Sequence, residues 1–296
     1  MTIHAERDFA IVDVFTRDAG GGNPLAVFFD GRGISDTAMQ RLAREFNFSE
    51  TTFVLPSDRD DCDFRVRIFT PTREVPFAGH PNIGTACALA ARGMLEHSQV
   101  RFEELAGRVV LTVDREQADH ARLRAPETFS EGESYPIALV SSVLGLAEDE
   151  IDISVHDPCE ASTGLPFSCV ALKSEASLRR AKVDLHALDI AVAAGVNPDL
   201  HCYVRDGQKI EARMFAPLDG VPEDPATGSA NCALVGLLAS RDPSVPDAAD
   251  WHVSQGVQMG RPSQLELHTV KHGGAVLEIY LAGACRAFAT GRARID

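Results

Sequence analysis

Residues 67–76 read RIFTPTREVP, and residues 213–222 read RMFAPLDGVP. Five of the ten aligned positions are identical, at an offset of 213 − 67 = 146, which is close to half of the 296-residue chain. Each stretch leads through a short turn containing glycine into a run of small and apolar residues, IGTACALAA and SANCALVGLLA. A helix that is apolar on every side is buried, so each half is expected to wrap a sheet around one central helix.

A chance match is the alternative, because many offsets can be compared. The shared strand, turn and apolar helix extend beyond the identities and favour a repeated unit. Strand-like runs dominate elsewhere, with helices between groups of them, which is typical of α+β folds. We therefore expect two pseudo-symmetric lobes, residues 1–126 and 127–296, with the last strand in the second lobe or returning to the first. The polar stretch at 126–136 (PETFSEGESYP) is the expected linker.

Local patterns predict individual elements. Ser35 can cap a helix that runs to Phe46, with Met39 and Leu42 on its apolar face. Pro81 suits the start of the first buried helix, because its fixed φ matches the first helical position. Further strands are expected at 9–16, 25–29, 51–55, 63–70, 167–173, 201–205 and 209–216, and further helices at 137–146 and 229–239.

Composition limits the classes of function. The chain has 43 Asp and Glu against 28 Lys and Arg, a net charge of −15, and 45% of its residues are hydrophobic. Such a chain folds, and its acidity argues against nucleic acid or a membrane as a partner. The seven cysteines form no C-x-x-C pair, which is typical of reduced thiols. With a polar start and no long apolar run, a cytoplasmic protein is expected.

The two turns before the buried helices carry different chemistry. The first, FAGHPN at 77–82, has one titratable group, His80, whereas the second, EDPATGS at 223–229, contains Asp224 and Ser229. Helix starts present unpaired N–H groups and a positive dipole end, which bind anions. The turns could therefore hold a carboxylate. Alternatively, Asp224 and Ser229 only cap a helix, and His80 makes a local hydrogen bond.

Glu50 lies between a helix end and an apolar strand in FSETTF, residues 48–53. Partial burial would raise its pKa and make it a general acid or base near neutral pH. A solvated glutamate in a loop is the alternative, and spacing alone favours it. The sequence contains no H-x-x-x-H, H-E-x-x-H or nucleotide-binding glycine motif, so neither a metal nor a cofactor is expected.

Five ordered motifs resemble the PhzF family of phenazine biosynthesis-like isomerases, which is related in fold to diaminopimelate epimerase and proline racemase. They are DVFT…GNPLAVF at 13–28, SETTFV at 49–54, FAGHPNIGTA at 77–86, EDPATGSANCAL at 223–234 and QGVQMGRPS at 255–263. The resemblance implies two lobes, each a mostly antiparallel curled sheet around a central helix, with the active site between them. It also implies a cytoplasmic, biosynthetic homodimer.

The family's chemistry can be carried over residue by residue. The resemblance implies a cofactor-independent isomerase in which Glu50 moves a proton between carbons of a small carboxylate-bearing, unsaturated amino or hydroxy acid. Asp224 and His80 would bind polar groups of the substrate. The substrate carboxylate would be held by residues at the helix starts: Gly79, Gly228 and Ser229. Asn82 and Asn231 depart from the threonine and histidine common at these positions, which leaves the substrate open.

Two alternatives to this isomerase remain. Related racemases and epimerases use one cysteine in each turn, but the turns here carry Ala78 and Ala226. Cys87 and Cys232 lie further along the predicted helices and are expected to point into cores. An amino-acid racemase or epimerase is therefore disfavoured. The other alternative is a non-catalytic PhzF-like binding protein.

Overall fold

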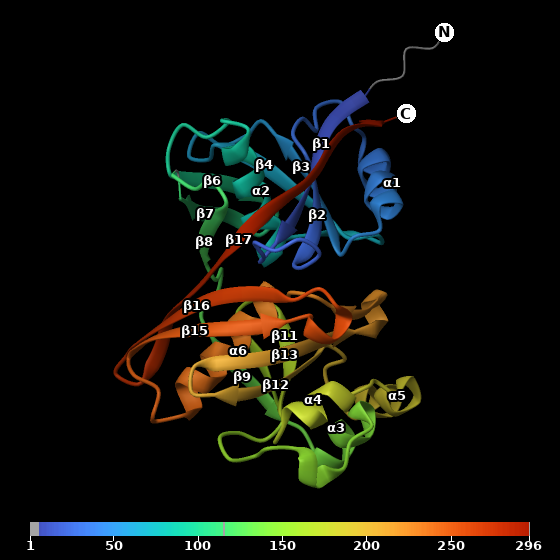
Figure 1. The fold of residues 1–296 in the computed structure, drawn as a ribbon, viewed down its shortest axis with the longest axis vertical. Coiled ribbons are helices and arrows are strands. Elements are labelled where there is room, and N and C mark those ends of the chain that lie inside the picture. The colour runs from blue at the N-terminus through green and yellow to red at the C-terminus, as the bar shows by residue number, and fades with distance from the viewer. Residues whose placement is uncertain (1–5, 115, 296) are drawn as a thin grey trace. The chain divides into compact units, whose positions relative to one another are not determined.

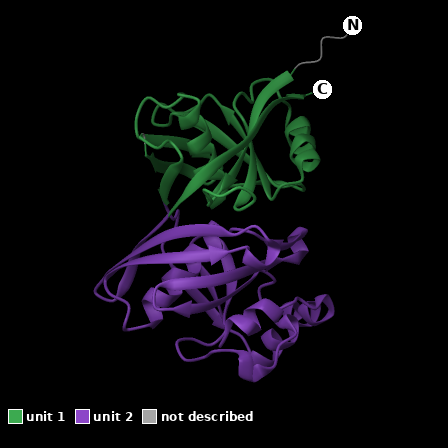
Figure 2. Ribbon diagram, in the orientation of Figure 1, with its two compact units in different colours: residues 1–123, 282–296 green, residues 124–281 purple. Residues whose placement is uncertain are grey.

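The computed structural model describes residues 6–114 and 116–295 and divides the chain into two units (Figures 1 and 2). The first unit comprises Met1–Leu123 and Ala282–Asp296, and the second comprises Arg124–Leu281. The division falls close to the expected boundary at 126/127. Strand β17 (Ala275–Arg294) begins in the second unit and ends in the first, where it pairs with β1 (Glu6–Val14).

The first unit contains a mostly antiparallel sheet. Its parallel neighbours are β2 with β3 and β4 with β6. Besides β1 and the end of β17, its strands are β2 (Asn23–Phe28), β3 (Glu50–Leu55), β4 (Phe64–Phe69), β5 (Glu74–Val75), β6 (Gln99–Glu104), β7 (Gly107–Val113) and β8 (His120–Arg124). Its helices are α1 (Asp36–Phe46) and α2 (Gly79–Ala91).

Helix α2 is the centre of this unit. Every residue from Gly79 to Leu89 is buried, and the helix contacts β1, β2, β3 and β7 (Figure 1). Gly84 permits the close approach, because a Cβ there would lie 2.7 Å from side-chain atoms of Leu25 and Val14. The expected buried helix is confirmed, and it begins two residues before Pro81.

Helix α1 confirms the local prediction. Ser35 is its N-cap, and the Ser35 hydroxyl accepts a hydrogen bond from the backbone N–H of Ala38 at 3.2 Å. Its apolar face packs on an aromatic cluster that includes Phe28, Phe53 and Phe69. The helix ends at Asn47, whose left-handed conformation (φ 53°) turns the chain toward β3.

The second unit repeats the plan with more helices. Its parallel neighbours are β11 with β12 and β13 with β15. The strands are β9 (Ser130–Ser134), β10 (Cys159–Ser162), β11 (Pro166–Ala171), β12 (Leu200–Asp206), β13 (Lys209–Ala216), β14 (Val221–Asp224), β15 (Ala248–Gln255) and β16 (Ser263–His272). The helices are α3 (Ile137–Leu144), α4 (Glu175–Arg180), α5 (Leu185–Ala193) and α6 (Gly228–Arg241), with 3₁₀ turns at Glu148–Glu150, Pro217–Asp219 and Val257–Met259.

The expected linker at 126–136 is wrong in part. Residues 130–134 form β9, which pairs with β10 and contacts the buried helix α6. The stretch is polar because β9 is largely exposed, and of its residues only Glu131 is partly buried. Composition therefore resembled that of a loop, whereas pairing with a strand distant in sequence made it part of the sheet.

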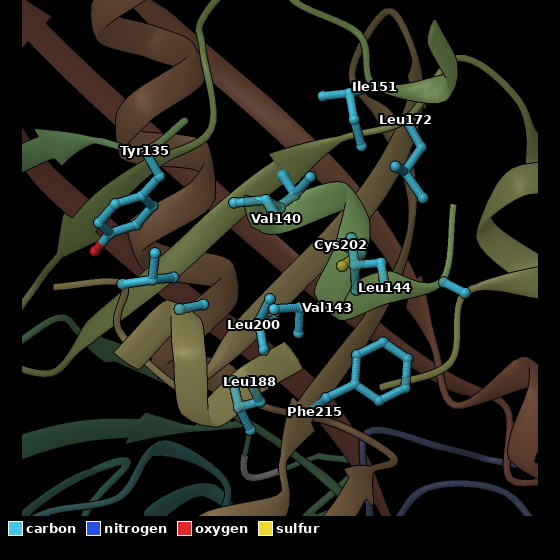
Figure 3. Packing of buried hydrophobic residues seen from close by; sticks show 14 of the residues in the cluster. Tyr135, Val140, Val143, Leu144, Ile151, Leu172, Leu188, Leu200, Cys202 and Phe215 are labelled. Carbon is cyan, nitrogen blue, oxygen red and sulfur yellow. The ribbon is translucent and has the colours of Figure 1, made fainter. Parts of the chain in front are cut away.

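A second apolar layer lies in this unit under α3, α4 and α5. Val140, Val143 and Leu144 of α3 and Leu188 of α5 point toward Leu200 and other strand residues (Figure 3). The outer helices α3, α4 and α5 pack on this layer. Helix α6 lies on the other side of the strands and contacts β9, β10, β11 and β16.

Contacts at the repeated stretches match in the two units. Arg67 makes a bidentate ion pair with Glu74, and Arg213 makes one with Glu223. Each guanidinium also stacks over the phenylalanine two residues later, at 5.1 Å and 4.8 Å from the ring centre. Shared contacts of this kind favour a repeated unit over a chance match.

Candidate active site

The start of α2 carries the first group of candidate residues. Its N-cap is Ala78, which offers no side-chain cap, so the N–H groups of Gly79 and His80 are left for other acceptors. His80 is buried, and burial lowers the pKa of its imidazole to about 3. The ring is therefore neutral at physiological pH. Its Nε2 is buried without a hydrogen-bond partner among the residues that the structure describes.

Glu50 lies beside this histidine. It is the first residue of β3, directly after the turn that ends α1, and its side chain is 17% exposed. Oε2 of Glu50 is 3.4 Å from Nδ1 of His80. The interpretation as a solvated loop glutamate, which spacing alone favoured, is wrong. Pairing of β3 with β2 in the register Leu25 to Glu50 places the carboxylate at the start of the buried helix.

The start of α6 carries the second group. Asp224 ends β14 and is 8% exposed, and its Oδ2 accepts a hydrogen bond from the Thr227 hydroxyl at 2.5 Å. The N-cap of α6 is Thr227, without a side-chain cap. Asp224 is therefore not a helix cap, and Ser229 is the second helical residue, as His80 is in α2. Gly228 is buried, whereas Ser229 is partly exposed.

Gln255 is a site residue to which sequence reasoning gave no role. It is fully buried at the end of β15. Its Nε2 donates to the Asp224 carbonyl (2.8 Å) and the Thr227 hydroxyl (3.1 Å). Its Oε1 accepts from the Thr227 N–H (3.2 Å) and from Nδ2 of Asn231 (2.7 Å). The QGVQMG motif was the available signal, but only the folded chain reveals its partners.

Thiol chemistry at these helix starts is not supported by the positions of the cysteines. Cys87 and Cys232 are buried within α2 and α6, and burial raises the pKa of the Cys232 thiol to about 12. No cluster of three or more His, Cys, Asp and Glu residues within 6–114 and 116–295 could hold a metal ion. Among the same described residues, no helix is long and apolar enough to cross a membrane.

The first prediction concerns Gly256, which follows Gln255 at φ +73°. A Cβ there would lie 2.5 Å from the Arg261 carbonyl oxygen and 2.7 Å from that of Pro225. Gly256→Ala should lower the free energy of unfolding by about 1–3 kcal/mol, through backbone strain and the clash. Gly220→Ala is the control, because it has φ +80° but nothing within 4 Å. Equal losses in denaturant titrations would contradict a role for the clash.

The second prediction concerns the neutral His80. Its ¹⁵N ring resonances, assigned with a His80→Asn variant, should keep the chemical-shift pattern of a neutral imidazole from pH 5 to 9, with no protonation step of the ring in that range. Because the folded pKa is about 3 and the unfolded value about 6.5, unfolding takes up a proton below pH 6.5. This group therefore costs stability as pH falls from 6.5 toward 3, and His80→Asn should lose that component. A titration midpoint near pH 6.5 for the His80 ring of the folded protein would refute the prediction that this ring is neutral.

Known proteins are similar to this one over nearly the whole length of the chain. A family model described as phenazine biosynthesis-like protein (PhzC-PhzF) matches residues 12–291. The chain is 37% identical over 291 residues to trans-2,3-dihydro-3-hydroxyanthranilate isomerase of Pseudomonas aeruginosa, covering 96% of this chain and 98% of that protein. It is 35% identical over 300 residues to an uncharacterised isomerase of Mesorhizobium japonicum, covering 97% and 98%.

Solved structures share the fold. A PhzF-family phenazine biosynthesis protein of Bacillus anthracis superposes with a TM-score of 0.88 at 24% identity, covering 98% of this chain and 99% of that one. A hydroxyproline epimerase of Agrobacterium vitis superposes with a TM-score of 0.66 at 13% identity, covering 100% and 94%. At such identities the likeness concerns the α+β fold alone. The family model and the full-length relatives together show that the chain belongs to the PhzF family of phenazine biosynthesis-like proteins, as one of its isomerases.

Proposed function

We propose that this isomerase shifts a proton between two carbons of a small unsaturated amino or hydroxy acid that carries a carboxylate, without a cofactor. The observation that carries the proposal is the position of Glu50, whose partly exposed carboxylate lies 3.4 Å from the neutral His80. In its ionised form Glu50 takes a proton from a carbon next to the unsaturated system. In its protonated form it returns that proton to another carbon, so the reaction leaves the enzyme unchanged.

His80 supports this role because its ring carries no charge. A cation 3.4 Å away would hold Glu50 in its ionised form and weaken it as an acid, whereas a neutral ring can donate one hydrogen bond and leave the carboxylate basic. Burial supplies this condition, since it disfavours the imidazolium. We assign His80 to orienting the carboxylate and, with Asp224, to binding an amino or hydroxyl group of the substrate.

The substrate carboxylate is assigned to the helix starts. Neither Ala78 nor Thr227 caps its helix with a side chain, so the first N–H groups of α2 and α6 can donate hydrogen bonds to an anion. Gly79 and Gly228 have no side chain that could cover their backbone N–H groups, and Ser229 adds a hydroxyl. This explains how a chain of net charge −15 binds an anion.

The first substrate to test is trans-2,3-dihydro-3-hydroxyanthranilate, named in the Pseudomonas aeruginosa relative. It has the amino group, hydroxyl group, carboxylate and unsaturated ring that the proposal requires. A panel of unsaturated cyclic and acyclic amino acids extends the test. An epimerase would instead exchange the α-proton for deuterium without moving a double bond, and a binding protein would do neither.

The third prediction tests Glu50. Glu50→Gln should lower kcat on the accepted substrate by about 10²–10⁴-fold, because the amide cannot take up or return the proton. Turnover is followed by NMR in D₂O, which also locates the deuterium delivered. Glu45→Gln, an exposed carboxylate on α1, is the control and should keep wild-type turnover. Near-full activity of Glu50→Gln would exclude this mechanism.

The fourth prediction tests the support of Asp224. Thr227→Val removes the hydroxyl that donates to Asp224 and accepts from Gln255. We expect kcat/KM to fall about tenfold, as for one lost hydrogen bond to a charged group, with Asp224→Asn falling further. Thr37→Val, at an exposed position of α1, should be neutral. If Asp224→Asn retained full kcat/KM, Asp224 would have no part in binding substrate.

A further inference from the structure

Glu104 is a buried carboxyl group with no role in the chemistry described above. It is the last residue of β6, on the same face as Val100 and Phe102, which point into the core. Glu104 is 8% exposed, and neither of its carboxyl oxygens has a hydrogen-bond partner within the described ranges. The side-chain amide of Asn82, in the first turn of α2, interacts with it without reaching hydrogen-bond geometry.

No charged group near Glu104 among the described residues pairs with its carboxyl group, so a negative charge there would not be compensated. Side chains at the outward positions of β4, β6 and β7 pair with one another or with nearby loops, and they are Arg65, Arg67, Glu103 and Arg108. On the inward side, His80 at the start of α2 is neutral. Burial raises the pKa of Glu104 to about 8, and the Asn82 amide opposes this only in part.

The internal repeat gives Glu104 a counterpart. In the first unit, β4 pairs with β6 in parallel in the register Phe64 to Phe102 and Arg65 to Glu103. In the second, β13 pairs with β15 in the register Ile210 to Val253 and Glu211 to Ser254. The offset of 146 converts 64 to 210 and 65 to 211. The next residue of the second strand is therefore Glu104 in one unit and Gln255 in the other.

The helix turns facing these two residues are also equivalent. Nδ2 of Asn82 donates to the Ala78 carbonyl at 3.1 Å, and Nδ2 of Asn231 donates to the Thr227 carbonyl at 2.9 Å. Both asparagines are the fourth residue of their helix. Gln255 accepts the second Nδ2 proton of Asn231 with Oε1 and donates with Nε2. The position of Gln255 therefore requires a side chain that both accepts and donates a hydrogen bond.

We propose that Glu104 is a positioning residue for the start of α2, held as a neutral carboxylic acid that replaces the glutamine of the second unit. Its carbonyl oxygen faces the Asn82 amide as Oε1 of Gln255 faces Asn231. Its O–H supplies the donor that Nε2 supplies in Gln255. A carboxylate could not do both, because it accepts hydrogen bonds only.

The neutral acid makes the start of α2 sensitive to pH. Ionisation places an uncompensated charge behind Asn82, two residues from His80, and costs the folded state free energy. Since the pKa rises on folding from about 4.5 to about 8, the stabilisation is complete below pH 4.5. It is lost between pH 4.5 and 8, with no further loss above. The effect on turnover rests on the proposed function, whereas the protonation state does not.

The fifth prediction is a matched exchange of acid and amide. Glu104→Gln should keep the hydrogen-bonding pattern and remove the titration, so its Tm should exceed that of the wild type by a margin that widens by several degrees from pH 5 to 8. Gln255→Glu introduces a titrating carboxyl group into the second unit, so its Tm should fall below that of the wild type by a margin that widens from pH 5 to 8. Glu103→Gln, at the neighbouring outward position, should leave the pH dependence of stability unchanged between pH 6 and 8, where the Glu103 carboxyl is ionised.

The protonation state is measured directly. In ¹³C-glutamate-labelled wild type, the carboxyl resonance absent from Glu104→Gln should titrate near pH 8, and the Asn82 side-chain amide should shift with it. A midpoint below 5, or an Asn82 amide indifferent to that titration, overturns the proposal. This holds even if Glu104→Gln fails to fold, because the signal can then be assigned with Glu104→Asp.

Turnover separates positioning from a structural role. The kcat of wild type should fall above pH 8, and Glu104→Gln should flatten that fall while keeping the kcat that wild type has below pH 8. Glu104→Leu also removes the titration, but it has neither donor nor acceptor, so its kcat should be low at every pH. An unchanged alkaline limb in Glu104→Gln overturns the positioning role. If no compound of the panel turns over, the proposed function fails, and the pH dependence of the His80 ring resonances decides positioning: they should move with Glu104 and stay fixed in Glu104→Gln.

Discussion

Each unit depends on the burial of a helix that has no polar side. Removing apolar surface from water is favourable by about 25 cal/mol per Å², so such a helix is stable only when strands cover it on all sides. Helices α2 and α6 are covered in this way, and Gly84 and Gly236 mark places where the cover comes too close for a larger side chain. The buried polar side chains of the helix starts are His80 and Asn82 in α2 and Asn231 in α6.

This packing also determines the charge state of the groups at the helix starts. Burial disfavours charge, so His80 is neutral, and burial likewise lowers the pKa of His201 to about 4. His201 therefore donates from Nε2 to Oδ1 of Asn231, an atom that can only accept. The polar residues behind both helix starts work as neutral hydrogen-bonding groups. The candidate carboxyl groups, Glu50 and Asp224, lie at strand ends beside them.

Features that depend on neighbours in sequence were predicted well. The cap at Ser35 needs only three residues, and the burial of both helices follows from their composition, because neither has a polar face. Strand β9 was missed, since an exposed strand of polar residues is recognisable only by its partner, here β10. Glu50 was ambiguous for the same reason: its surroundings come from β2 and α2, not from adjacent residues.

The inward position of Glu104 was visible in the sequence, since Val100, Phe102 and Glu104 alternate with polar residues. Its equivalence to Gln255 was not visible, because the two stretches around them share no motif. The equivalence emerges only from the strand register, in which β6 and β15 pair with corresponding residues of β4 and β13.

The sequence by itself therefore determined the repeat, the two buried helices and the motifs at their starts, because these follow from identity, hydrophobicity and short-range spacing. Tertiary structure decided that Glu50 lies beside His80, that Gln255 holds the turn of Asp224, and that Glu104 occupies a glutamine's position. Each of these contacts joins strands or helices far apart along the chain, and their registers are set by packing around the helices rather than by local preference.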